Sequence, residues 1–61
     1  MGKKFKFEIG RKVQLSASEE HGEVVGRAEY KNNENQYLVY YQAGDGRAVE
    51  SWWNEHRLVG V

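Results

Sequence analysis

Residues 36–53, with the sequence QYLVYYQAGDGRAVESWW, decide the fold of this chain. The first part of this stretch is rich in tyrosine and valine, which favour β-strands. The Asp-Gly pair near its centre is the strongest short signal for a tight hairpin turn. The stretch therefore predicts two antiparallel strands, residues 36–42 and 47–53, joined by a four-residue loop over residues 43–46.

The length of this loop also sets which residues of the two strands lie opposite each other. Pairing outward from a four-residue loop sets Gln42 against Arg47, Tyr40 against Val49 and Gln36 against Trp53. Successive side chains of a strand point to opposite faces of a sheet. The register therefore determines which aromatic side chains share a face.

The remaining sequence shows the same apolar period of two, which is typical of strands. Apolar residues alternate with charged ones over residues 5–9, and Val13 and Leu15 continue the pattern. Residues 16–22 have no periodicity and predict a long exposed loop. A second strand is predicted over residues 23–30, where Gly26 marks a bend or a bulge.

The carboxyl-terminal part completes a five-stranded pattern. Residues 31–35 form a polar turn before the central hairpin. After the hairpin, residues 54–56 predict a single helical turn capped by Asn54, and residues 57–59 predict a short closing strand. The chain therefore reads as all-β, with one helical turn before the last strand.

The length, the cysteine content and the charge of the chain limit the kinds of function that it can have. The 61 residues form one domain, residues 1–61, with no cysteine for a disulfide or a thiolate metal site. Nine Lys and Arg balance nine Asp and Glu, so the net charge gives no overall attraction to nucleic acid or membrane. Basic residues gather near the amino terminus, and residues 1–8 are predicted to be a loose basic strand or arm. Without a membrane-spanning apolar run or a signal peptide, we expect a cytoplasmic protein with no membrane partner.

Five short strands, a long first loop, two tight hairpins and a helical turn before the last strand are typical of a small five-stranded SH3-like barrel. We therefore predict this fold class. The main competitor is the OB-fold, which normally needs a longer chain and a helix between its third and fourth strands.

One family shares a set of these positions. The pattern resembles the plasmid-encoded type II dihydrofolate reductases at positions spread over residues 10–58: Gly10-x-x-Val13, Gly22-x-Val24-Val25-Gly26, Tyr30, Tyr37-x-Val39 and Leu58. Those enzymes are SH3-like barrels that work as homotetramers around one central pore. The resemblance implies the same fold and a phage or plasmid origin.

The catalytic motif of that family is missing. The family has Val-Gln-Ile-Tyr on the strand that lines the pore, whereas this chain has Glu50-Ser51-Trp52-Trp53 there. A lysine that binds cofactor phosphate in the family corresponds to Leu15. Two indoles would fill the pore and Glu50 would repel a phosphorylated cofactor, so we predict that the chain is not an enzyme and binds no cofactor.

The paired tryptophans are the most informative candidates for a binding site. Because neighbouring strand residues face opposite ways, one indole should be at least partly exposed. Exposed aromatics can stack bases, cage a methylammonium group or grip a proline-rich peptide. We predict a non-catalytic module that binds a protein partner or a second copy of itself through the third and fourth strands. The predicted site comprises Trp52 or Trp53, Tyr37 and Tyr40, with Arg47, Glu50 and Arg57 at a polar rim.

Two alternatives stay open at this point. The same aromatics, together with the basic amino terminus, could bind nucleic acid, although zero net charge weakens this case. A divergent reductase-like nucleotide binder would have to assemble around a pore. The histidines predict neither a metal site nor catalysis, because His21 lies among acidic residues of a loop and His56 has no obvious nucleophile beside it.

Overall fold

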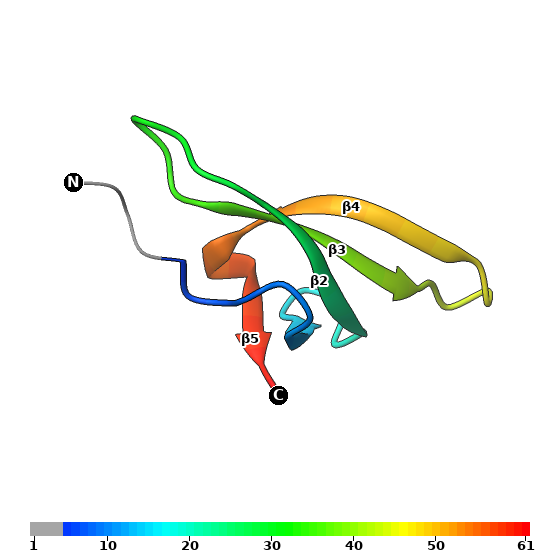
Figure 1. The fold of residues 1–61 in the computed structure, drawn as a ribbon. Helices are drawn as coiled ribbons and strands as arrows, with labels where there is room; N and C mark the ends of the chain where they lie inside the picture. Colours follow the sequence, from blue (N-terminus) through cyan, green and yellow to red (C-terminus); the bar gives the residue numbers. More distant parts are fainter. Residues whose placement is uncertain (1–4) are drawn as a thin grey trace.

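The computed structural model describes residues 5–61 and shows one antiparallel sheet of five strands in the order β4-β3-β2-β1-β5 (Figure 1). A single turn of 3-10 helix, η1, separates the last two strands. The all-β class and the helical turn before the last strand are therefore confirmed. The elements are β1 (Lys12–Leu15), β2 (His21–Ala28), β3 (Gln36–Gln42), β4 (Ala48–Asn54), η1 (Glu55–Arg57) and β5 (Leu58–Gly60).

The sheet is open. Over residues 5–61, β4 pairs with β3 and β5 pairs with β1, and no ladder joins β4 to β5. The barrel closure expected from the sequence is thus not present in this sheet. The physical reason lies in strand length, because β1 and β5 have only four and three residues and cannot cover the far half of the seven-residue β4.

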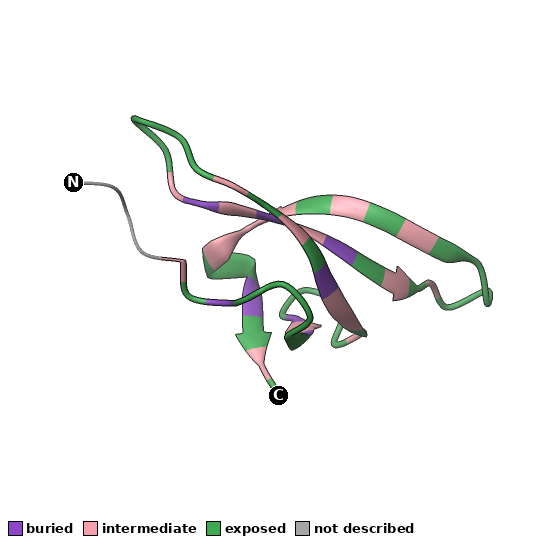
Figure 2. Ribbon diagram, in the orientation of Figure 1, coloured by how far each residue is buried: buried purple, intermediate pink, exposed green. Residues whose placement is uncertain are grey.

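Buried positions alternate with more exposed ones along β3 (Figure 2), so the core lies on one side of the sheet, here called the inner face. The opposite side is called the outer face. Figure 2 also shows that the far end of the β3–β4 hairpin carries exposed and half-buried residues. The small core agrees with the limited burial that a domain of this size achieves. Its buried hydrophobic residues are Phe7, Val13, Leu15, Val24, Tyr37, Val39 and Leu58.

The amino-terminal segment corrects the sequence prediction. Residues 5–11 form bends and turns and not a strand, and within them Phe7 is buried whereas Ile9 is 60 % exposed. Gly10 adopts a φ of +96° and donates a hydrogen bond to the carbonyl oxygen of Val24 at 2.7 Å, which ends the apparent alternation. Of the arm predicted over residues 1–8, the first four residues lie outside the described part of the chain.

The prediction of a bend or bulge at Gly26 is confirmed. Val24 lies opposite Val39, but the next pair is Gly26 with Leu38, so Val25 is an extra residue in β2. The bulge changes which positions face the core. Val24 is buried in the inner face, while Gly26 lies on the outer face beside Leu38.

The β3–β4 register is shifted by one residue from the predicted register. Gly46 has a φ of +91°, its N–H donates to the carbonyl oxygen of Ala43, and the N–H of Ala43 donates to the carbonyl oxygen of Arg47. This is a three-residue loop with a glycine in the left-handed region, a common hairpin alternative to the four-residue loop. Gln42 therefore lies opposite Ala48, and Tyr40 lies opposite Glu50.

The helical turn begins after Asn54, but the side chain of Asn54 does not cap it. Its Oδ1 instead accepts a hydrogen bond of 2.7 Å from Nε2 of Gln36.

Among the described residues, none lies in a helix that is long and apolar enough to span a bilayer.

Candidate functional site

The exposed indole belongs to Trp52. On the outer face, Trp52 of β4 lies opposite Leu38 of β3, and Leu38 lies opposite Gly26 of β2. Trp52 is 51 % exposed and Tyr40, two residues beyond Leu38 on β3, is 47 % exposed. We call these three side chains, Trp52, Tyr40 and Leu38, the outer aromatic surface.

Gly26 supplies the floor under the indole of Trp52. A Cβ atom at Gly26 would lie 4.0 Å from Cη2 of Trp52 and 3.3 Å from Cβ of Leu38. The bulge that presents Gly26 on this face therefore lets the ring reach across β3 towards β2. Trp52 is thus supported on one side by backbone and open to solvent on the other.

Trp53 and Tyr37 lie on the opposite face. Trp53 packs edge-on against Tyr41, with ring centroids 6.2 Å apart, and pairs across the hairpin with Tyr37. Tyr37 is fully buried, and the rings of Phe5 and Phe7 pack against it edge-on. These two predicted site residues therefore belong to the core and its margin, so they cannot join Trp52 in an aromatic cage.

The hydroxyl of Tyr37 ties three parts of the chain together. It accepts hydrogen bonds from the backbone N–H of Lys6 at 2.8 Å and of Phe7 at 3.3 Å, and it donates one to Oε2 of Glu55. Burial and the neighbouring carboxylate of Glu55 raise the pKa of Tyr37 above its ordinary value. The hydroxyl therefore holds the amino-terminal segment against η1. The sequence gives no signal for this role, because both partners are distant along the chain.

Substituting Tyr37→Phe is expected to lower the free energy of unfolding by about 1–3 kcal/mol, since the buried N–H of Phe7 loses its partner. The N–H of Lys6 and the carboxylate of Glu55 each lose one hydrogen bond but still bond to each other at 3.1 Å. The raised pKa also has a consequence for alkaline stability. The folded state holds the phenol proton more tightly than the unfolded state, so this contribution is complete below pH 10 and is lost as the pH rises further. Urea unfolding at neutral pH and at successive steps above pH 10 measures both effects.

Tyr30→Phe is the matched control, because Tyr30 is exposed and its hydroxyl donates a hydrogen bond to the side chain of Gln36. This variant is expected to keep both the stability and the alkaline loss of the parent protein. An unchanged alkaline loss in Tyr37→Phe would contradict the role given to the Tyr37 hydroxyl.

The three residues predicted at a polar rim lie in separate places. Glu50 is opposite Tyr40 on the outer face and therefore borders the outer aromatic surface. Arg47 is at the hairpin tip, where its Nε lies 2.8 Å from Oδ2 of Asp45. Arg57 is in η1 beyond the other end of β4, and its carbonyl oxygen accepts hydrogen bonds from Ser16. Only Glu50 is placed to contact a ligand on this surface.

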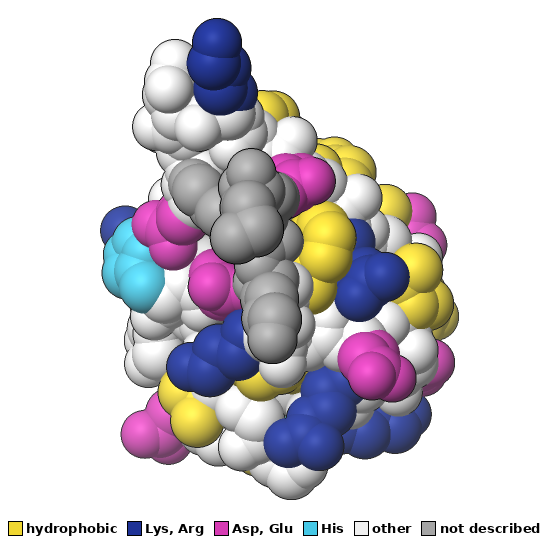
Figure 3. Space-filling model, turned by 60° about the vertical axis from the view of Figure 1, so that its left-hand side comes forward, with side chains coloured by type: hydrophobic (Ala, Val, Ile, Leu, Met, Phe, Trp, Pro, Cys, Tyr) yellow, Lys and Arg dark blue, Asp and Glu magenta, His cyan; other side chains and the backbone are white. Residues whose placement is uncertain are grey.

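The charged side chains near the outer aromatic surface are mainly acidic or paired. Glu23 of β2 lies opposite Tyr40, and it forms an ion pair of 3.2 Å with Lys12. Arg27 lies over the ring of Phe5, on the inner side, with its guanidinium carbon 4.4 Å from the centroid. Figure 3 shows positive and negative side chains interspersed among small hydrophobic patches on the face it draws. A row of cations alternating with exposed aromatics is therefore not formed here by these residues.

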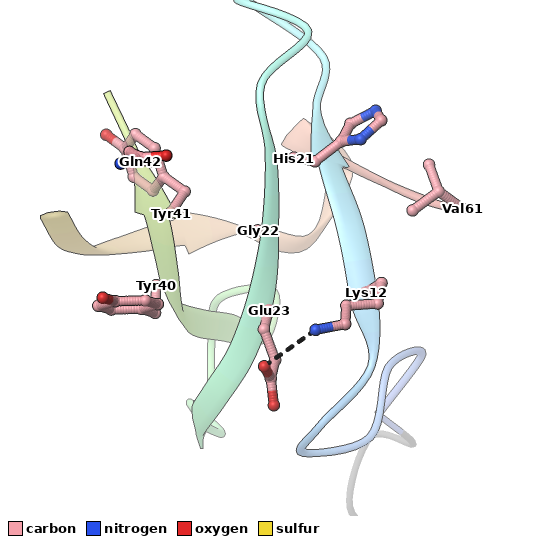
Figure 4. Close-up of a pocket in the computed structure, with 8 residues that line it drawn as sticks. All are labelled: Lys12, His21, Gly22, Glu23, Tyr40, Tyr41, Gln42 and Val61. Atoms are coloured by element: carbon pink, nitrogen blue, oxygen red, sulfur yellow. Dashed lines mark hydrogen bonds and ion pairs between the residues drawn. The ribbon is translucent and has the colours of Figure 1, made fainter. Parts of the chain in front are cut away.

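A shallow cavity of about 420 Å³ extends this surface towards the amino-terminal end of β2 (Figure 4). Its lining includes Tyr40, Tyr41, His21 and the Lys12–Glu23 pair. Figure 4 shows that the side chains of His21 and Glu23 point in different directions. The cavity therefore adds polar groups to one border of the outer aromatic surface.

The role of this surface has to come from its own chemistry. Comparisons with protein-family models, curated proteins and solved structures found no match. The surface offers a flat half-exposed indole, a half-exposed phenol and carboxylates at its border. Such a surface is suited to burying apolar area against a partner.

Proposed function

We propose that this chain is a non-catalytic protein-binding module of the SH3-like barrel type, and that it binds its partner through the outer aromatic surface. The observation that carries the proposal is the position of Trp52, half exposed yet supported by Gly26 and Leu38. A large aromatic ring that is ordered before binding loses little conformational freedom on contact. Tryptophan is also among the residues that dominate binding energy at interfaces.

The strand order supports the fold named in this proposal. The chain runs β4-β3-β2-β1-β5, with a 3-10 turn before the last strand and a bulge in β2. Bulges of this kind bend strands at the corners of small barrels. Catalysis forms no part of the proposal, because Glu50-Ser51-Trp52-Trp53 lacks the catalytic side chains that the reductase family has at the corresponding positions.

The charges favour a protein partner over nucleic acid. Tyr40 lies between Glu23 on one side and Glu50 on the other. Lys12, which lines the same cavity as Tyr40, is paired with Glu23. Carboxylates beside an aromatic surface repel phosphate groups. They are compatible with the polar rim that surrounds a protein interface.

Trp52→Ala is expected to weaken partner binding by about 30-fold, the effect of losing an anchor worth roughly 2 kcal/mol. The parent protein and Trp52→Ala serve as matched baits, and each protein captured by the parent bait is purified and its affinity for both baits measured. Ile9→Ala is the control, because Ile9 is exposed and apolar but lies in the amino-terminal turn. Equal affinity for the parent and Trp52→Ala would contradict the proposal.

A second measurement separates the partner classes. Amide NMR spectra of the labelled protein contain two indole N–H signals, and that of Trp52 reports on the outer aromatic surface. We expect this signal to stay in place when a short single-stranded oligonucleotide or NADPH is added. A shift with oligonucleotide that disappears at high salt would favour nucleic-acid binding, and a shift with NADPH would favour the nucleotide-binding alternative.

A further inference from the structure

The outward edge of β4 is long and unprotected. Among the described residues, β4 forms a ladder only with β3, so its other side presents unpaired backbone groups over seven residues, Ala48–Asn54. Proteins usually protect such edges with lysine, proline or a very short strand. The sequence of β4, AVESWWN, has a single charged residue, Glu50, and no lysine or proline. By contrast, the edge strand β5 has only three residues.

The hairpin geometry identifies which backbone groups point outward. The hydrogen bond from the N–H of Ala43 to the carbonyl oxygen of Arg47 makes this a hydrogen-bonded pair. Hydrogen-bonded and non-hydrogen-bonded pairs alternate in an antiparallel ladder. The groups of Val49, Ser51 and Trp53 therefore point to β3, and those of Ala48, Glu50 and Trp52 point to the free edge.

The β3–β4 hairpin also projects from the rest of the molecule (Figure 1). The described chain measures 41 × 19 × 17 Å along its principal axes, so it is elongated. Tyr41 and Val49, which face each other on the inner side of this arm, are only half-buried. An additional strand beside β4 would therefore meet both free backbone groups and incompletely buried apolar side chains.

We propose that this edge pairs with the same edge of a second copy, forming a two-fold dimer through antiparallel β4 strands. The second copy is the occupant because β4 is self-complementary in one register. Centred on Ser51, the pairing sets Glu50 against Trp52 of the second copy and Ala48 against Asn54, and it uses all seven residues. A shift that centres on Glu50 would set two carboxylates directly opposite each other, which is destabilising.

This dimer goes beyond the proposed function, because it uses a strand edge and not the outer aromatic surface. A two-fold interface closes on itself and leaves no free β4 edge for further growth. It would join the two five-stranded sheets into one, with the outer aromatic surfaces of both copies side by side. The oligomeric state tests the proposal about the β4 edge, whereas the affinity for a partner tests the proposal about the outer aromatic surface. Either proposal can therefore be contradicted without the other.

Disulfide trapping tests the register directly, because the chain has no cysteine of its own. At the two-fold axis Ser51 meets Ser51 in a non-hydrogen-bonded pair, where Cα atoms lie about 4.5 Å apart, within the range that a disulfide spans. Under mild oxidation Ser51→Cys is expected to form a covalent dimer at least about tenfold faster than Ser18→Cys, since pairing raises the effective thiol concentration. Ser18 is the matched control because it is exposed in the β1–β2 loop.

Sedimentation of the unmodified chain across a concentration series provides the second measurement. We expect a reversible monomer–dimer equilibrium that Glu50→Pro abolishes, since this substitution removes an outward N–H while sparing the ladder to β3. Glu50→Ala keeps the N–H and should dimerise like the parent. A parent protein that is monomeric throughout, or equal cross-linking of the two cysteine variants, would overturn the proposal. If Glu50→Pro does not fold, the comparison of Ser51→Cys with Ser18→Cys still tests the proposal.

Discussion

Replacing Gly22 with alanine is expected to lower the free energy of unfolding by about 3 kcal/mol, at the upper end of overpacking effects. Gly22 lies in β2, opposite Tyr41 of β3. A Cβ atom there would lie 2.7 Å from both the carbonyl oxygen of Tyr40 and Cγ1 of Val39, and 2.9 Å from Cβ of Tyr41. One of these contacts is backbone, so the strain cannot be relieved by rotating a side chain. Urea unfolding followed by circular dichroism measures the loss.

Gly44→Ala is the control for this effect. Gly44 is in the hairpin loop, and a Cβ atom there would meet nothing within 4 Å. The free energy of unfolding of the Gly44→Ala variant should stay within about 0.5 kcal/mol of the parent value, as for most substitutions at exposed sites. Similar unfolding midpoints for Gly22→Ala and Gly44→Ala would show that β3 does not approach Gly22 as closely as described.

Trp53→Ala is expected to cost about 3–4 kcal/mol, whereas Trp52→Ala should cost about 1 kcal/mol or less. Trp53 packs against Tyr41 and the buried core, while half of Trp52 already faces solvent. Thermal unfolding of both variants gives the comparison. The reverse order of stabilities would mean that the two indoles have exchanged faces.

Trp53→Phe sharpens this comparison. The indole N–H of Trp53 is buried and has no hydrogen-bond partner among the described residues. Phenylalanine retains most of the packing and removes this unsatisfied donor, whose burial carries a cost. We therefore expect Trp53→Phe to retain most of the stability that Trp53→Ala loses.

The central hairpin could be predicted well from the sequence because its signals are local. Residues 36–42 were predicted as a strand with the observed bounds, and Gly26 was identified as a bulge. The predicted register is wrong by one residue, because the length of the loop depends on the backbone conformation of Gly46 itself and not only on the presence of an Asp-Gly pair. A left-handed glycine at the end of the loop shortens it to three residues, and sequence alone does not separate this turn from the four-residue alternative.

The amino-terminal segment and the sheet closure were harder to predict for a different reason. The alternation over residues 5–9 is typical of a strand, but this segment has no strand partner and instead inserts Phe7 into the core. Barrel closure depends on contacts between elements that are far apart in the chain. Period and turn signals describe each strand by itself and do not report those contacts.

The candidate site was predictable in part. Alternation of side chains correctly required one exposed indole, but only the observed register identified it as Trp52 and grouped it with Tyr40 and Glu50. Tyr37 is a strand aromatic like Tyr40, yet it is fully buried because it occupies the opposite parity. The rim arginines Arg47 and Arg57 could not be placed without the three-dimensional path of the chain.

The pairing of β1 with β5 has a consequence for the order in which parts of the chain fold. β3 and β4 are joined by a short loop, and hairpins of this kind form within about 1–10 μs. By contrast, Leu15 pairs with Leu58, so the ends of the domain must meet across nearly its whole length. Long loops carry a higher closure entropy and slow the step that depends on them. We therefore expect the hairpin to form while its apolar inner face is still uncovered, and the core to be completed only when Leu58 pairs with Leu15.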